Sequence, residues 1–121
     1  MSKAVVLFAH GARDPLWAKP IEAVRQQVLS NNSSANVVLA YLEFMSPTLT
    51  ECVERLVGEN IVDITVIPMF IAAGGHLKND VPKLLNQLLI QHPSLSIEIT
   101  EPVGEFVEVQ SAIADRLNTY L

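Results

Sequence analysis

Four short apolar runs, each followed by a helix-like segment, constrain the fold of this chain more than any other feature. The runs span residues 4–9, 36–42, 61–67 and 95–99, and the first three are almost continuously apolar. Strands that are buried on both faces of a parallel sheet have this composition. The fourth run alternates apolar and polar residues, which is typical of a strand at the edge of a sheet.

After each run, apolar residues recur at the three- and four-residue spacing of an amphipathic helix. These stripes are Ile21, Val24, Val28 and Leu29; Leu49, Cys52, Val53 and Leu56; Val81, Leu84, Leu85, Leu88 and Leu89; and Val109, Ile113 and Leu117. Ser46 and Pro47 predict the start of the second helix. The order βαβαβαβα predicts an α/β fold, in which a four-stranded parallel sheet is flanked by helices and built from flavodoxin-like βαβ units.

Length and composition favour one globular domain in a reducing compartment. The chain has 121 residues, of which 50% are hydrophobic, and no linker or low-complexity tract divides it, so we expect a single domain over residues 1–121. The apolar fraction excludes a disordered chain, and the single Cys excludes an intramolecular disulfide. The apolar run at 4–9 is far shorter than the roughly 20 residues of a membrane span. We therefore expect a cytoplasmic protein with no membrane partner.

The net charge argues against a nucleic-acid partner. Thirteen acidic residues against eight Lys and Arg give a formal charge of −5 at pH 7. Proteins that bind nucleic acid or anionic membranes present the opposite, basic surface. A chain of this length also encloses a large ligand poorly by itself, so a site formed between two copies is one of our hypotheses.

Polar side chains follow the first three predicted strands. His10 ends the first, Glu43 ends the second, and Gly74-Gly75-His76 lies in the loop after the third, at equal intervals close to one βαβ repeat. Ligands of open parallel sheets bind at the carboxyl ends of the strands. If the first strand lies between the second and the third, His10, Glu43 and His76 converge on one cleft. Two imidazoles and a carboxylate suit divalent cobalt, nickel, iron or zinc, which predicts a metal or acid–base site.

Several of these residues also have a purely structural interpretation. A histidine at a strand end is often a hydrogen-bonded loop residue, and Glu43 alone is an ordinary solvated carboxylate or the partner of a helix N-terminus. Arg13 has two interpretations as well. It either forms a local ion pair with Asp14 or binds a substrate carboxylate through its planar guanidinium.

The loop after the third strand is ambiguous in the same way. Met69 and Phe70 either plug the end of the sheet or floor a pocket for a flat apolar ligand. Gly75, with Gly74 before it, allows unusual backbone geometry next to His76. A phosphate site is weakly indicated, because these glycines match neither the dinucleotide pattern nor the P-loop pattern.

Three motifs are combined along the chain. They are His10-Gly11-Ala12-Arg13-Asp14-Pro15 after a buried strand, Leu42-Glu43 followed by Pro47, and Pro68-Met69-Phe70 leading to Gly75-His76 with Asp80 and Pro82. Together they resemble the small sirohydrochlorin chelatases of the CbiX type, and the resemblance covers nearly the whole chain. It differs at Ala12, where relatives often have Ser. The resemblance implies a lyase of the class II chelatase family that inserts a divalent metal into sirohydrochlorin in cobalamin or other tetrapyrrole biosynthesis.

The resemblance also implies roles for individual residues. His10 and His76 would bind the metal and accept the pyrrole protons, and Glu43 would match the acidic position of the family. Our hypothesis adds contacts to the macrocycle from Arg13, Met69, Phe70 and Gly75. The metal is expected to be a substrate, so no tightly bound cofactor is implied. A homodimer is implied too, because longer relatives resemble two such domains fused.

Other functions could use the same residues. A non-enzymatic carrier would bind metal or tetrapyrrole without turnover. A phosphoryl-transfer enzyme with His10 as nucleophile would need several arginines, whereas Arg13 is the one that lies close to it in the sequence. Cobalt is predicted from the resemblance alone, and iron and nickel are the alternative metals.

Overall fold

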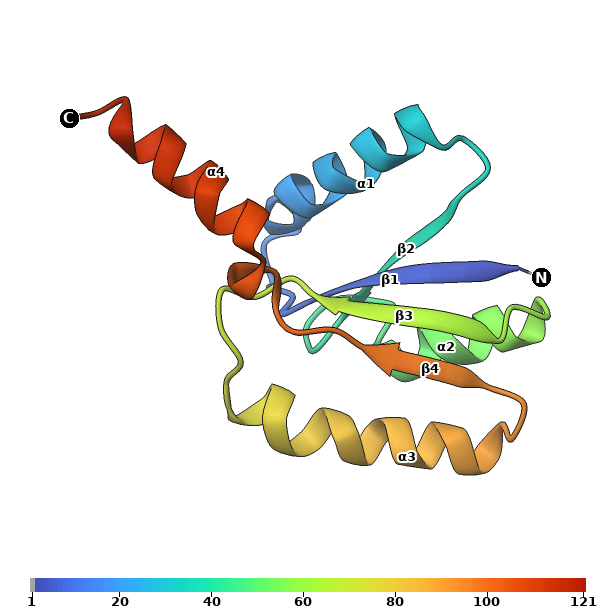
Figure 1. The fold of residues 1–121 in the computed structure, drawn as a ribbon. Helices are drawn as coiled ribbons and strands as arrows, with labels where there is room; N and C mark the ends of the chain where they lie inside the picture. Colours follow the sequence, from blue (N-terminus) through green and yellow to red (C-terminus); the bar gives the residue numbers. More distant parts are fainter. Residues whose placement is uncertain (1) are drawn as a thin grey trace.

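The chain folds into a parallel sheet with helices on both faces. The computed structural model describes residues 2–121, and of His76 it describes the backbone but not the side chain. The strands are β1 (Lys3–Ala9), β2 (Asn36–Tyr41), β3 (Asp63–Pro68) and β4 (Ser96–Ile99). The helices are α1 (Lys19–Asn31), α2 (Leu49–Gly58), α3 (Val81–Gln91) and α4 (Val107–Asn118) (Figure 1). Three short helical turns, η1 (Pro15–Ala18), η2 (His76–Asp80) and η3 (Val103–Glu105), precede α1, α3 and α4.

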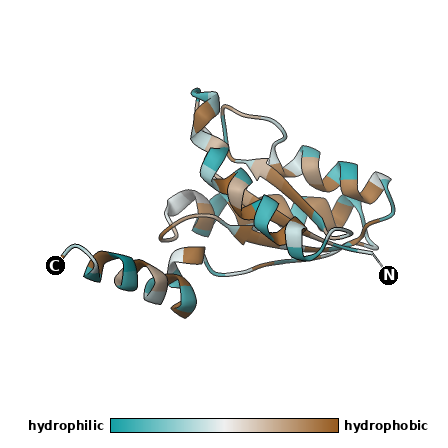
Figure 2. Cartoon of the chain, turned by 90° about the horizontal axis from the view of Figure 1, so that it is seen from above, coloured by the Kyte–Doolittle hydropathy of each residue, from teal (hydrophilic) through white to brown (hydrophobic). Residues whose placement is uncertain are grey.

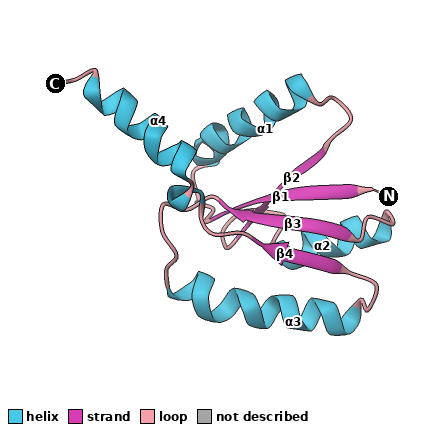
Figure 3. Cartoon of the chain, in the orientation of Figure 1, coloured by secondary structure: helices cyan, strands magenta, loops and turns pink. Residues whose placement is uncertain are grey.

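The sheet has the order β2-β1-β3-β4, and its strands are all parallel. In the register of the sheet, Val6 of β1 pairs with Val38 on one side and with Val66 on the other. Figure 3 shows the strand arrows pointing the same way, with β1 in the interior and β4 at one edge. The α/β prediction is therefore confirmed, including the central position of the first strand on which the predicted site depends.

The main hydrophobic core lies between the sheet and the pair α2 and α3. Alternate residues of the central strands are buried in it, among them Val6, Phe8 and Ile64. Complete burial of one such side chain stabilises the fold by about 1.5–3 kcal/mol. Cys52 of α2 is buried in the same core, as its place in the apolar stripe predicts. Burial raises the pKa of its thiol to about 11, so that this thiol stays protonated near neutral pH.

The opposite face of the sheet is covered incompletely. Ala9, Ala18 and Tyr41 form a small buried cluster there with Ile21 and a few neighbours. No residue of α1 is fully buried. In Figure 1, α1 lies alone on this face, while α4 extends away from the sheet. None of the described helices is long and apolar enough to cross a membrane.

The second helix begins later than the sequence predicts. Its N-cap is Thr48, whose hydroxyl accepts a hydrogen bond from the backbone N–H of Glu51 (3.2 Å). The Glu51 carboxylate accepts one from the Thr48 N–H (2.9 Å). This reciprocal capping box satisfies two free N–H groups, which the predicted cap at Ser46 does not. Pro47 instead extends the edge of the sheet, because its carbonyl accepts from the Tyr41 N–H (2.9 Å).

Turn η3 packs tightly on the loop that follows β3. The Gly104 N–H donates to the Phe70 carbonyl (3.0 Å), and Pro102 just before the turn is buried. A Cβ at Gly104 would lie 1.8 Å from the Ile71 carbonyl oxygen. Only glycine fits here without moving the loop, and this contact fixes where α4 begins.

We predict that Gly104→Ala lowers the free energy of unfolding by about 1–3 kcal/mol, because the added methyl group overlaps the Ile71 backbone. Gly58 provides a matched control, since nothing lies within 4 Å of its Cβ position. Gly58→Ala should be neutral or stabilise the chain by up to about 1 kcal/mol. Urea unfolding followed by circular dichroism measures both changes. Equal stability of the two variants would contradict the tight packing of η3.

Candidate functional site

His10 lies at the carboxyl edge of the sheet, directly after β1. Its carbonyl accepts a hydrogen bond from the Glu43 N–H (3.0 Å), beside a bond from the Leu42 N–H to the Ala9 carbonyl (2.8 Å). Backbone pairing thus continues past the ends of β1 and β2. His10 and Glu43 are both exposed. The structure therefore brings these two predicted residues together at a solvent-accessible edge.

Gly11 allows the two loops to approach this closely. Its φ is +87°, and a Cβ at this position would lie 2.0 Å from the Glu43 carbonyl oxygen. Such a φ lies in the left-handed region that favours glycine. Any side chain at residue 11 would separate His10 from Glu43. Within the His10 motif, this glycine is therefore the residue that sets the geometry.

An aromatic ring from the neighbouring loop contacts His10. The centroids of the Phe70 and His10 rings are 4.6 Å apart, with 42° between the ring planes. Phe70 also lies 6.0 Å from the buried ring of Phe8 and packs against the main core. The Met69 N–H donates to the Phe8 carbonyl (2.7 Å), which holds this loop against β1. Phe70 thus supports the imidazole from the core, while Met69 packs into the smaller cluster on the α1 side.

Arg13 stacks on an aromatic ring at the same edge. Its guanidinium carbon lies 5.0 Å from the centroid of Phe44, a cation–π distance. The Asp14 carboxylate, the predicted alternative partner of Arg13, caps η1 by accepting from the Leu16 N–H (2.9 Å). Arg13 is exposed. Its charge is therefore available at the rim beside His10.

No pattern in the sequence predicts Phe44 as a site residue. This residue has a φ of +67°, which is an outlier for a bulky side chain, and the residue is 58% exposed. A strained backbone of this kind costs about 1–3 kcal/mol and is found most often at functional sites. The available signal was an aromatic residue directly after Glu43, where the strand pattern has already ended.

His76 can be placed only in part. It begins η2, immediately before α3, and its side chain lies outside the described residues. The predicted meeting of His76 with His10 and Glu43 therefore stays a prediction. Gly75 is exposed and lies outside the left-handed region, so the unusual backbone geometry expected of it is absent. In the described part of the chain, no three His, Cys, Asp or Glu residues gather into a metal-binding group.

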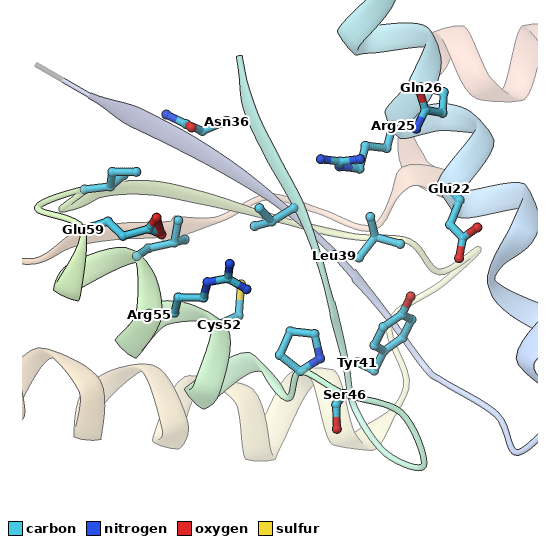
Figure 4. A pocket seen from close by; sticks show the side chains of 14 residues that line it. Glu22, Arg25, Gln26, Asn36, Leu39, Tyr41, Ser46, Cys52, Arg55 and Glu59 are labelled. Carbon is cyan, nitrogen blue, oxygen red and sulfur yellow. The ribbon is translucent and has the colours of Figure 1, made fainter. Parts of the chain in front are cut away.

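A cavity of about 540 Å³ lies away from these residues, around the free edge of β2. Arg25 of α1 and Arg55 of α2 line it from opposite sides of this strand (Figure 4). The Arg25 Nε donates to the Val37 carbonyl (2.6 Å) and so covers part of the strand edge. Tyr41 also lines the cavity, and burial, with a smaller contribution from the Glu22 carboxylate, raises the pKa of its hydroxyl. None of the predicted site residues lines this cavity.

Comparison with known proteins gives matches over nearly the whole chain. The sequence model of the CbiX family matches residues 4–120. A protein of Saccharolobus solfataricus named sirohydrochlorin cobaltochelatase is 32% identical over 120 residues, which cover 94% of this chain and 92% of that protein. A crystal structure described as a putative cobalamin biosynthesis CbiX protein from Marinobacter aquaeolei VT8 has a TM-score of 0.83 at 32% identity. It covers 98% of this chain and 96% of that one.

A longer relative shows the same fold. The sirohydrochlorin chelatase SirB from Bacillus subtilis, solved in complex with cobalt, has a TM-score of 0.76 at 27% identity. The match covers 98% of this chain but 51% of SirB, so this chain spans about half of the SirB length. With the family model matching from β1 to the last residues after α4, the chain belongs to the CbiX family.

Proposed function

We propose that this chain inserts a divalent metal ion, cobalt in the first place, into sirohydrochlorin. Metal and tetrapyrrole are both substrates in this reaction. The observation that carries the proposal is the exposed His10 imidazole, held by Phe70 beside Glu43 at the carboxyl edge of a CbiX-family sheet. Relatives that are 32% identical over 94% of the chain are named sirohydrochlorin cobaltochelatase, which supports this reaction.

Metal insertion requires a ligand that binds the ion exchangeably and a base that accepts protons. As the M²⁺ ion enters the ring, two pyrrole N–H bonds break and two protons leave. One divalent ion thus replaces two protons, and the charge of the macrocycle does not change. A neutral imidazole can hold the ion and can also accept a proton near neutral pH. We assign both tasks to His10 and infer that His76 is the second ligand. Glu43 orients His10 or takes the proton from it.

The macrocycle is flat and carries several carboxylates. Phe44 and Phe70 present aromatic surface at the edge of the sheet, and Met69 lies in the same loop as Phe70. Arg13, stacked on Phe44, can bind a carboxylate of the substrate in a bidentate manner. This cation lies at the site itself, where it attracts an anionic substrate that the formal net charge of −5 repels at longer range. Gly75 lies in the loop that leads to His76 and is assigned to the same macrocycle contact.

The chain is inferred to act as one CbiX-type domain over residues 1–121 and to form a homodimer in the cytoplasm. The family model covers residues 4–120 as one match, and SirB is about twice as long as this chain. Two copies would together supply the surface that one SirB chain contains. A buried, protonated Cys52 is compatible with a reducing compartment. Cobalamin biosynthesis is the pathway proposed for the cobalt product.

Turnover distinguishes this enzyme from a non-enzymatic carrier. With the protein far below sirohydrochlorin in concentration, we expect cobalt insertion to be much faster than with free Co²⁺ alone. Absorbance of the tetrapyrrole measures the rate, and parallel anaerobic assays with Fe²⁺ and Ni²⁺ give the metal preference. A rate equal to that of the free metal, or one equivalent of product per protein and no more, would rule out the chelatase.

His10→Ala should abolish most of the insertion activity and leave the fold intact, because the side chain is exposed. Loss of a general base alone lowers a rate by about 100- to 10,000-fold. His92→Gln is the matched control, since His92 follows α3 at the opposite, amino-terminal edge of the sheet. Insertion rates and thermal unfolding of both variants provide the test. Wild-type activity in His10→Ala, or an equal loss in both variants, would refute the assignment.

Arg13→Met should raise the KM for sirohydrochlorin by about 10- to 100-fold with little change in kcat, because a charge-assisted hydrogen bond to substrate is lost. Lys83→Met removes the same charge from an exposed position on α3 and serves as the control. Steady-state kinetics at several ionic strengths separate a specific contact from the general field. If both variants had the same KM, Arg13 would not anchor the macrocycle.

A further inference from the structure

Strand β2 lies at the margin of the sheet, so one of its two edges has no neighbouring strand. Just past its end, the Leu42 N–H bonds to the Ala9 carbonyl, which continues the pairing of β2 with β1. Backbone groups alternate in direction along a strand, so those of Leu42 and of every second residue before it face β1. Val37, Leu39 and Tyr41 therefore direct their N–H and carbonyl groups to the free edge.

The free edge is closed at both ends and open in the middle. The Val37 carbonyl accepts a hydrogen bond from the Arg25 Nε (2.6 Å), and the Tyr41 N–H donates one to the Pro47 carbonyl (2.9 Å). For Leu39, which lies between them, no partner on this side is found in the described part of the chain. Unpaired N–H and carbonyl groups on an edge strand are a template for another chain. The two closures leave Leu39 at the centre of that template.

The cavity of about 540 Å³ borders Leu39 and receives its charges from the flanking helices. The strands themselves are largely hydrophobic (Figure 2). Arg25 of α1 and Arg55 of α2 lie on opposite sides of β2, and Figure 4 shows both guanidinium groups directed toward the strand edge. Glu22 and Glu59 lie toward the two ends of the cavity, with the arginines between them. The middle of the cavity is therefore cationic.

Both guanidinium groups have donors to offer. Arg25 uses its Nε for the Val37 carbonyl, which leaves its terminal nitrogens, and Arg55 is exposed near the end of α2. Among the described residues, no ion pair joins either guanidinium to a carboxylate. A guanidinium binds a carboxylate through two parallel N–H bonds. The cavity thus offers an anchor for a carboxylate on each face of the strand.

A strand added to this edge would present its side chains to the two arginines in turn. A residue opposite Leu39 in an antiparallel pair exchanges both backbone hydrogen bonds with it and directs its side chain to the same face. Leu39 packs into the small cluster on the α1 side, where Arg25 lies. The next residue of the added strand points to the other face, toward Arg55. Two consecutive acidic residues therefore match the two guanidinium groups.

We propose that the free edge of β2 is a docking site for a partner protein that presents a short extended segment with two consecutive acidic residues. The segment pairs with Leu39 through its backbone and with Arg25 and Arg55 through its carboxylates, which is a form of β-strand addition. The formal charge of −5 disfavours an acidic segment over the rest of the surface, so these two cations select the place. None of the residues proposed for metal insertion lines the cavity. A partner bound here therefore leaves the carboxyl edge of the sheet accessible.

Titration of the ¹⁵N-labelled chain with a capped peptide, Gly-Ser-Glu-Asp-Ser-Gly, tests the site. The control peptide has Gln-Asn in place of Glu-Asp. At physiological ionic strength, the acidic peptide should shift the Leu39 amide signal most and bind at least about 10-fold more tightly than the control, which lacks both charge-assisted contacts. Equal binding of the two peptides, or shifts centred away from β2, would overturn the proposal. Neither metal nor tetrapyrrole is present, so the outcome is independent of the insertion reaction.

Substitution of one arginine tests the charge match. Arg55→Gln changes an exposed position, so the fold should stay intact. It should weaken binding of the acidic peptide about 10-fold and leave the control peptide unchanged, whereas Lys83→Gln on α3 should change neither. Free succinate, which carries two carboxylates and no peptide backbone, should not shift the Leu39 amide. Wild-type peptide binding by Arg55→Gln, or a succinate shift equal to that of the acidic peptide, would refute docking of an acidic segment.

Discussion

Two backbone hydrogen bonds at the carboxyl end of β1 hold the candidate site together. The Glu43 N–H donates to the His10 carbonyl from one side of this strand, and the Met69 N–H donates to the Phe8 carbonyl from the other. Both bonds follow from the place of β1 between β2 and β3. Because parallel strands deliver their carboxyl ends to one edge, residues distant in sequence become neighbours of His10. The chemistry proposed for the edge depends on this pairing.

Close backbone contacts define the shape of the carboxyl edge of the sheet. Gly11 and Gly104 are both approached by a carbonyl oxygen at a distance that excludes a side chain. The first contact joins the His10 and Glu43 loops, and the second seats η3 on the Phe70 loop. Phe44 has a strained backbone and an exposed aromatic ring, which therefore does not contribute to the hydrophobic core. An apolar ring held in solvent next to a cation is suited to a flat anionic ligand.

The sequence was sufficient for the sheet and for the pairing of His10 with Glu43, because the apolar periodicity and the equal βαβ intervals are visible in the order of residues alone. It was insufficient where tertiary contacts decide. The left-handed Phe44 and its contact with Arg13 depend on loops that meet only in the folded chain. The start of α2 depends on the Thr48 capping box and on the bond between Pro47 and Tyr41. The α4 stripe predicted a helix, but not that the helix leaves the sheet.

We infer that the metal is delivered at the carboxyl edge of β1. Titration of the ¹⁵N-labelled chain with paramagnetic Co²⁺ tests it directly, because amide signals broaden according to their distance from the bound ion. Broadening should begin at the amides around His10, Glu43 and Phe70 and should spare the loop containing His92 at the other end of the sheet. Broadening that is centred on His92, or spread evenly over the acidic surface, would contradict the claim.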